Sequence, residues 1–201
     1  QVYLTAEERA ITRLAWRDYH THKAMYDLAP LAIPFLFQTG LRIGELCAVR
    51  YEDIESPDYI HVQRMYNKDT KKVIEHTKTD CGDRQVILTQ KAKEIIRTAR
   101  SRQKEVGADS TGYIFSMDGK PVPQYAVAYR FRKYCKEYGT MVKSSHKVRK
   151  TYISALLDAH VNINTVRELV GHSDERTTLK NYCFDRNTEA EKREKVEKAL
   201  A

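Results

Sequence analysis

Imidazole and guanidinium side chains stand at helical spacing in the segment "SHKVRKTY". His146 and Arg149 are three residues apart, so on a helix they would share one face. Neither group suits an apolar interior, because both require polar partners. Facing a phosphate, Arg149 would offer a bidentate clamp and His146 a proton donor or acceptor. Taken alone, the pair is better explained as the solvated face of a basic helix.

Two other segments carry cations beside turn residues. Arg42 and Glu45 in "TGLRIGEL" have the same three-residue spacing, which indicates either a local ion pair or an arginine that Glu45 orients into a cleft. Lys78 in "EHTKTDCGDRQVIL" comes at the end of a predicted strand, where it enters a turn. For a single lysine in a hairpin, a solvated surface position is the commoner outcome.

The segment "GHSDERTTLKNY" places His172 ten residues before Tyr182. On one straight helix these residues would be separated by about 15 Å along the axis and would not share a face. Gly171 is a typical helix stop and Asp174 a typical N-cap, so we expect His172 in a break and Tyr182 at the end of a second short helix. A phenol is a poor nucleophile unless cations stabilise its anion. With thirteen tyrosines in the chain, any one of them is structural by default.

Composition narrows the class of protein. The 201 residues suit a single domain, and the net charge of +8 favours a polyanionic partner, although a merely solvated basic surface is an equal alternative. The four cysteines form no C-x-x-C pair, so neither zinc nor a disulfide scaffold is expected, and we predict reduced thiols in a cytoplasmic protein. No long apolar run or secretory signal predicts a membrane partner. Because Gln1 is not an initiator methionine, we expect a fragment of a longer protein.

Hydrophobic periodicity predicts a mainly α fold with a small antiparallel β-sheet, of the α+β class. We expect a capping box at Thr5 and Glu8, and a buried helix that Pro30 or Pro34 starts or kinks and Gly40 ends. The expected sheet has three strands, at 58–66, 71–78 and 84–89. The expected helices span 4–20, 26–40, 43–54, 90–107, 124–139, 146–160, 162–171, 174–182 and a charged tail from 187 to 201, with a strand and turn at 112–123.

Taken together, "TGLRIGEL", "HTKTDCGDRQVIL", "HKVRKTY" and "LVGHSDERTTLKNY" resemble, in order, four motifs of the tyrosine recombinases, the phage and transposon integrase family. The similarity covers the chain from about Leu4 to Phe184. It implies that family's catalytic-domain fold and a site in which Tyr182 attacks the scissile phosphate. The other implied catalytic residues are Arg42, Lys78, His146, Arg149 and His172, with Glu45 in support.

The resemblance also implies a mechanism and partners. Arg42 and Arg149 would stabilise the phosphate, Lys78 would protonate the leaving 5′-oxygen, and the histidines would hydrogen-bond the phosphate. The 3′-phosphotyrosyl link conserves the bond energy, so no cofactor or metal is expected. The implied partners are double-stranded DNA, a homo-tetramer on paired sites and accessory DNA-bending proteins.

Domain limits follow from the same resemblance as expectations. We expect residues 1–201 to be one catalytic domain with a helical tail from about 185, and without the family's N-terminal DNA-binding domain. A solvated helix is the default for such a charged tail, and the resemblance implies docking on a neighbouring protomer as the alternative. Cys183 and Phe184 depart from the small polar residue and histidine of many relatives. Alternatives are a type IB topoisomerase-like activity or a non-catalytic DNA-binding module. From their residue types we select as DNA contacts cationic residues of the helix at 124–139 and of the third strand: Arg130, Arg132, Lys133 and Arg84. For the helix, solvated charge with the tyrosines and phenylalanine in the core is a nearly equal alternative.

Overall fold

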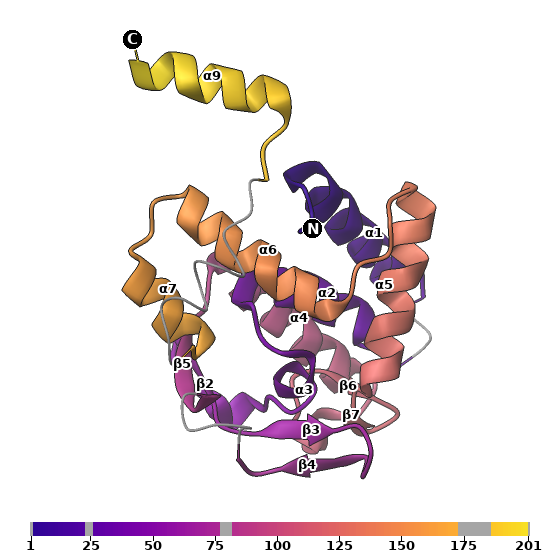
Figure 1. The fold of residues 1–201 in the computed structure, drawn as a ribbon. Coiled ribbons are helices and arrows are strands. Elements are labelled where there is room, and N and C mark those ends of the chain that lie inside the picture. Colours follow the sequence, from indigo (N-terminus) through magenta and orange to yellow (C-terminus); the bar gives the residue numbers. More distant parts are fainter. Residues whose placement is uncertain (1, 23–25, 77–81, 173–185, 201) are drawn as a thin grey trace.

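Five long helices form the body of the protein, with helix α2 at its centre (Figure 1). The computed structural model describes residues 2–22, 26–76, 82–172 and 186–200. Within these ranges α2 contacts each of the other four helices, and α1 also contacts α5. The bounds are α1 (Thr5–Thr21), α2 (Ala29–Thr39), α4 (Gln90–Glu105), α5 (Gln124–Tyr138) and α6 (Ser145–Asp158).

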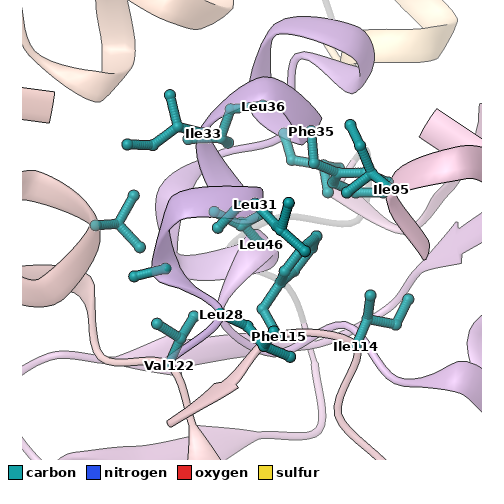
Figure 2. Close-up of a cluster of buried hydrophobic side chains, with 14 of the residues drawn as sticks. Leu28, Leu31, Ile33, Phe35, Leu36, Leu46, Ile95, Ile114, Phe115 and Val122 are labelled. Atoms are coloured by element: carbon teal, nitrogen blue, oxygen red, sulfur yellow. The ribbon is translucent and has the colours of Figure 1, made fainter. Parts of the chain in front are cut away.

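Helix α2 is central because its sequence, "APLAIPFLFQT", is apolar on every side. Leu31, Ile33, Phe35 and Leu36 are fully buried, and Figure 2 shows them among side chains from other segments, such as Phe115. Pro30 lies in the first turn, where its missing N–H leaves no hydrogen bond unmade, so the prediction that a proline starts this helix is confirmed. Gly40 ends the helix, also as predicted, in a left-handed conformation.

Helix α1 begins one residue away from the predicted capping arrangement. Leu4 is the N-cap, and its backbone N–H donates to Glu7 Oε2 at 2.8 Å. Glu8, which the sequence pattern selected for that role, instead pairs with Arg186. A long-range ion pair, which no local pattern contains, therefore uses the predicted capping carboxylate.

The β structure differs from the single sheet that was predicted. One antiparallel sheet has the order β1-β2-β5, and a separate hairpin contains β3 and β4. The predicted strand at 58–66 is split at Gln63 and Arg64, because Arg64 turns inward to the buried carboxylate of Asp53. The bounds are β1 (Ile54–Ser56), β2 (Tyr59–Val62), β3 (Met65–Asn67), β4 (Lys72–Ile74) and β5 (Arg84–Ile87).

The helix predicted at 43–54 is also shorter than expected. Only one turn forms, α3 (Ile43–Leu46), before the chain passes through a 3-10 turn, η1 (Tyr51–Asp53), into β1. The Val49 carbonyl accepts the N–H of Ile114, and the Arg50 N–H is used by Asp53, so both groups leave the helical pattern. A second 3-10 turn, η3 (Asp109–Thr111), and the hairpin of β6 (Ser116–Met117) and β7 (Lys120–Pro121) follow α4.

Two further helices complete the described chain. Helix α7 (Ile163–Val170) lies against β5 and α6, and α9 (Glu189–Leu200) stands apart from the body (Figure 1). The predicted fold class, mainly α with small antiparallel β structure, is confirmed. Within the described ranges, no helix combines the length and the apolar character needed to cross a membrane. Cys47 and Cys135 are buried free thiols, whereas Cys81 and Cys183 lie outside the described residues.

Candidate active site

Arg149 joins the ends of two other helices to α6. Its side chain is almost wholly buried, with 2% of the residue exposed. Nη1 donates to the Gly40 carbonyl at 2.8 Å, and Nη2 donates to the Val170 carbonyl. Gly40 ends α2 and Val170 ends α7, so one guanidinium holds three segments that are far apart in sequence.

Arg42 follows Gly40 closely and is the N-cap residue of α3. Its backbone N–H donates to Glu45 Oε2 at 2.8 Å and its Nη1 to Glu45 Oε1 at 2.7 Å. The side chain is 38% exposed, and it lines a groove of about 460 Å³ beside β3. Of the two sequence interpretations, the ion pair with Glu45 therefore exists, and it also directs the arginine toward a groove.

Glu45 is the buried carboxylate of the site, with only 3% of the residue exposed. Burial alone would raise its pKa, but hydrogen bonds and positive charge from Arg84, together with the charges of Arg149 and Arg42, lower the pKa to about 2. Glu45 is therefore ionised at every physiological pH. It compensates part of a strongly positive cluster.

Arg84 is not a surface DNA contact, and the prediction that selected it for DNA binding is wrong. The residue is 8% exposed, and it donates to both oxygens of Glu45 at 3.0 and 2.9 Å. It also donates to the carbonyls of Leu169, at 2.8 Å, and Gly82, at 2.9 Å. These four hydrogen bonds turn the guanidinium into the protein, where a duplex cannot reach it.

A sequence signal for this inward direction did exist. Arg84, Val86 and Leu88 alternate with Gln85 and Ile87 in "RQVIL", so Arg84 falls on the buried face of a strand. The carbonyls of Gly40, Leu169 and Val170, by contrast, are backbone groups that no residue-type pattern could have selected.

His172 emerges directly from the end of α7. Gly171 is left-handed with φ of 61°, and the N–H groups of Gly171 and His172 bond back to the carbonyls of Glu168 and Arg167, each at 3.1 Å. This Schellman arrangement confirms the predicted helix stop. The ring is half-buried. Burial, followed by the charges of Arg149, Arg42 and Arg84, lowers the pKa of His172 to about 4, so the imidazole is neutral near pH 7.

His146 lies in the first turn of α6 and is more exposed than Arg149, with which it shares that helix end. Partial burial, with the charges of Lys150, Arg149 and Lys147, lowers the pKa of His146 below its ordinary value. The two imidazoles and three arginines thus influence one another electrostatically, as neighbours in one site do. The combination of fixed positive charge and neutral imidazole hydrogen-bonding groups suits a phosphodiester.

Some predicted site residues fall outside the structural description. Lys78, Asp174 and Tyr182 lie outside the described residues, so the structure brings together Arg42, Glu45, His146, Arg149 and His172 only. In the described part of the chain, no group of three or more His, Cys, Asp and Glu side chains is arranged to hold a metal ion.

Two of the three cations predicted on α5 to contact DNA have structural roles instead. Arg130 pairs with Asp18 at 3.0 Å and with Asp27 at 2.6 Å, and Lys133 pairs with Asp18 at 2.8 Å. These bonds fasten α5 to α1 and to the chain before α2, because Asp18 is a buried carboxylate that requires cationic partners. Arg132 alone of the three is exposed to solvent.

Comparison with known proteins supports one family. Residues 7–189 match the phage integrase family. A tyrosine recombinase XerC-like protein of Caldanaerobacter subterraneus is 28% identical over 184 residues, which cover 81% of this chain and 45% of that protein. The integrase of Staphylococcus phage L54a is 26% identical over 181 residues, which cover 81% and 49% of the two chains. This chain therefore spans less than half the length of these relatives.

Solved structures with the same fold include a Tn1549 transposon integrase in complex with transposon right end DNA, with a TM-score of 0.72 and 22% identity over all of this chain and 66% of that one. The XerA recombinase has a TM-score of 0.71 and 20% identity over all of this chain and 64% of that one. At such identities the likeness establishes the fold, while the family match rests on sequence. The chain belongs to the phage integrase family, and its fold is that of the tyrosine recombinase catalytic domain.

Proposed function

We propose that this chain is the catalytic domain of a site-specific DNA recombinase, which cleaves and rejoins strands through a 3′-phosphotyrosyl intermediate. The supporting observation is the cluster formed by Arg42, His146, Arg149 and His172. These residues come from three distant segments and share one electrostatic environment around the buried carboxylate of Glu45. In the described part of the chain, Arg42, Arg84 and Arg149 act on the one carboxylate of Glu45, and such concentrated positive charge favours an anionic ligand.

In the proposed reaction the Tyr182 oxygen attacks the scissile phosphorus and the 5′-oxygen leaves with a proton from Lys78. Arg42 and Arg149 stabilise the charge that builds on the non-bridging oxygens. His146 and His172 are hydrogen-bond partners of the phosphate, and a neutral imidazole can also accept the phenol proton. A second strand's 5′-hydroxyl reverses these steps, so the reaction needs no cofactor within this proposal.

A groove beside the cluster supports duplex DNA as the substrate. Its inner part, at Arg42, shares Tyr66, Lys68 and Gln124 with a wider part of about 830 Å³ that reaches α5. Lysines line this wider part: Lys68, Lys71 and Lys120. Exposed side chains on one face of α5 continue it at positions 125, 129 and 132, where two tyrosines and Arg132 offer stacking and phosphate contacts.

Assembly and location are part of the same proposal. We expect a homo-tetramer on paired DNA sites, assisted by accessory DNA-bending proteins, in the cytoplasm. The λ integrase fragment with which this chain shares a TM-score of 0.60 is a dimer bound to a core site, which supports a multimeric DNA complex. Helix α9, which stands apart from the body, suits a contact with a neighbouring protomer (Figure 1).

Covalent capture on nicked duplexes tests the proposed chemistry. A pool of nicked duplexes with randomised arms is incubated with the protein, and adducts that survive denaturation are isolated and sequenced. Wild type should give a 3′-linked adduct on a defined site, and Tyr182→Phe should give none. Tyr138→Phe, which alters an exposed tyrosine at the end of α5, is the matched control and should react as wild type does.

Two outcomes would contradict the proposal. Absence of any adduct from a folded, DNA-binding wild type would indicate the non-catalytic module. Relaxation of supercoiled plasmid without joining of two duplexes would indicate the topoisomerase-like activity.

A further inference from the structure

Arg84 lies beneath the candidate active site and connects three of its segments. It belongs to β5, but its four hydrogen bonds reach Glu45 in α3, Leu169 at the end of α7 and Gly82 just before its own strand. Neither the phosphate chemistry proposed above nor the packing of the sheet requires these particular partners. Two of these partners lead to other site residues, because Glu45 pairs with Arg42 and Leu169 lies at the helix end from which His172 emerges.

The first partner, Glu45, links Arg84 to Arg42. Each oxygen of Glu45 accepts from Arg84 and from Arg42, at distances between 2.7 and 3.0 Å. The carboxylate therefore lies between two cations, one buried and one facing the groove. Because Arg84 fixes both oxygens, it also fixes the plane in which Glu45 can hold the Arg42 guanidinium.

The second partner, the Leu169 carbonyl, links Arg84 to the end of α7. The Leu169 carbonyl accepts from Arg84 Nε at 2.8 Å, and the next carbonyl, of Val170, accepts from Arg149. Two arginines therefore hold consecutive carbonyls at the helix end from which His172 emerges through Gly171. A displacement of this helix end would move the backbone of His172, and its imidazole would move with it.

We propose that Arg84 is a positioning residue for strand cleavage, which sets the direction of Arg42 through Glu45 and the place of His172 through the Leu169 carbonyl. This inference rests on the proposed recombinase function. Lysine cannot replace Arg84 in it, because an ammonium group lacks the planar fork that binds both carboxylate oxygens and a carbonyl together.

The test measures the rate of covalent adduct formation in single turnover, at saturating nicked DNA and at a temperature where each variant is folded by circular dichroism. Arg84→Gln should slow adduct formation on the order of 100-fold, because small misplacements of reacting groups have effects of that size. DNA affinity should change by less than about threefold, since Arg84 does not face the groove. Arg84→Lys keeps the charge beside Glu45, remains testable if the glutamine variant fails to fold, and should be slowed similarly.

Arg102→Lys is the matched control. Arg102 is buried to a similar extent, pairs with Glu105 and lies on α4, which packs mainly on α2 and η3. This variant should lose thermal stability but cleave at the wild-type rate. If folded Arg84→Lys also cleaves at the wild-type rate, Arg84 has only a structural role and the inference is wrong.

A double-mutant cycle tests the route through Glu45. In an Arg42→Lys background, where the oriented guanidinium is already gone, Arg84→Gln should slow cleavage much less than it does in wild type. If the double variant instead shows the full product of the two single rate effects, the substitutions act independently and the proposed route through Glu45 is wrong. Failure of wild type to form an adduct would instead refute the proposed function, so the two failures are distinguishable.

Discussion

At the scale of single residues, the site is built on one buried carboxylate among several cations. Glu45 pairs with Arg42 and Arg84 and is influenced by Arg149, which keeps it ionised. Burial, and after it the same positive charge, also lowers the pKa of the nearby imidazoles, because both oppose protonation. Loss of a proton makes a carboxyl group charged and an imidazolium neutral, so the one site holds a charged acid beside neutral bases.

The ionisation of His172 can be predicted from this field. In the DNA-free protein we expect the NMR signals of its ring to titrate with a midpoint near pH 4 and not near 6.5. Binding of a DNA duplex should raise the midpoint, because a phosphodiester anion stabilises the imidazolium. The signal is assigned by its loss in His172→Asn, and a midpoint near 6.5 without DNA would contradict the half-buried position of the ring beside the arginines.

This shift also has a consequence for stability. Between pH 4 and 6.5 the unfolded chain protonates His172 while the folded protein does not, so the folded state binds fewer protons. The free energy of unfolding should therefore fall as the pH falls through that window. His172→Asn should reduce this dependence in chemical denaturation experiments.

At the scale of elements, two helices end in left-handed glycines that face the site. Gly40 ends α2 and Gly171 ends α7, with φ of 62° and 61°. The carbonyl of Gly40 and the last carbonyls of α7 accept from Arg149 and Arg84. Cations at helix C-termini are favourable because they complement the helix dipole, so the helix ends stabilise the arginines as well as being held by them.

Among the glycines whose surroundings are described, Gly40 leaves the least room for a side chain. A Cβ added there would lie 2.3 Å from the Tyr152 ring of α6, closer than any real contact allows. Gly40→Ala should therefore lower the free energy of unfolding by roughly 3 kcal/mol, with ~1–2 kcal/mol from the left-handed backbone and the rest from overpacking. Denaturant unfolding measures this value, and adduct formation should fall with it because the Gly40 carbonyl holds Arg149.

Gly139→Ala provides the comparison for this prediction. Gly139 also ends a helix, α5, with φ of 80°, but an added Cβ would meet nothing within 4 Å. Its cost should be only the backbone term, about 1–2 kcal/mol. Equal losses for the two variants would mean that α6 can move away from Gly40 without penalty.

At the scale of the whole molecule, the apolar helix α2 brings the site segments together. Residues near 42, 84, 149 and 172 are distant in sequence, and they meet because α6 packs on α2, and α7 packs on both α6 and β5 (Figure 1). The groove that begins at Arg42 then extends past the β3–β4 hairpin to α5. The lysines that line the groove concentrate part of the net charge of +8 on this side of the molecule.

Removing the charge of that groove should weaken DNA binding in a salt-dependent way. The triple variant Lys68→Gln, Lys71→Gln and Lys120→Gln should bind non-specific duplex more weakly, with the slope of log affinity against log salt reduced by roughly 0.9 for each phosphate that the protein no longer neutralises. Fluorescence anisotropy over a salt series measures this slope. The matched control changes three exposed cations on α4 to glutamine: Lys91, Arg97 and Lys104. If the α4 variant binds DNA as weakly as the groove variant does, the effect depends on the total charge of the protein and not on the groove.

Sequence alone determined the family, the fold class, most helices and the identity of the motif residues. These properties depend on local patterns: apolar periodicity for α2, glycine stops at 40 and 171, and fixed spacings such as that of Arg42 and Glu45. The catalytic roles of those residues stay predictions, including those of Lys78 and Tyr182. Strand pairing was predicted poorly, because the division of 58–66 depends on Arg64 turning inward to Asp53, a buried carboxylate eleven residues earlier in the chain.

Only the tertiary structure decided which cations face the groove and which face the protein. Arg84, Arg130 and Lys133 have the same residue types as a DNA-binding surface, but each lies beside a buried carboxylate, Glu45 or Asp18, contributed by another element. A buried carboxylate must be compensated, and the nearest cation in space takes that role regardless of its distance in sequence. The direction of a charged side chain is therefore a property of the packed molecule, since it is set by partners that local sequence does not contain.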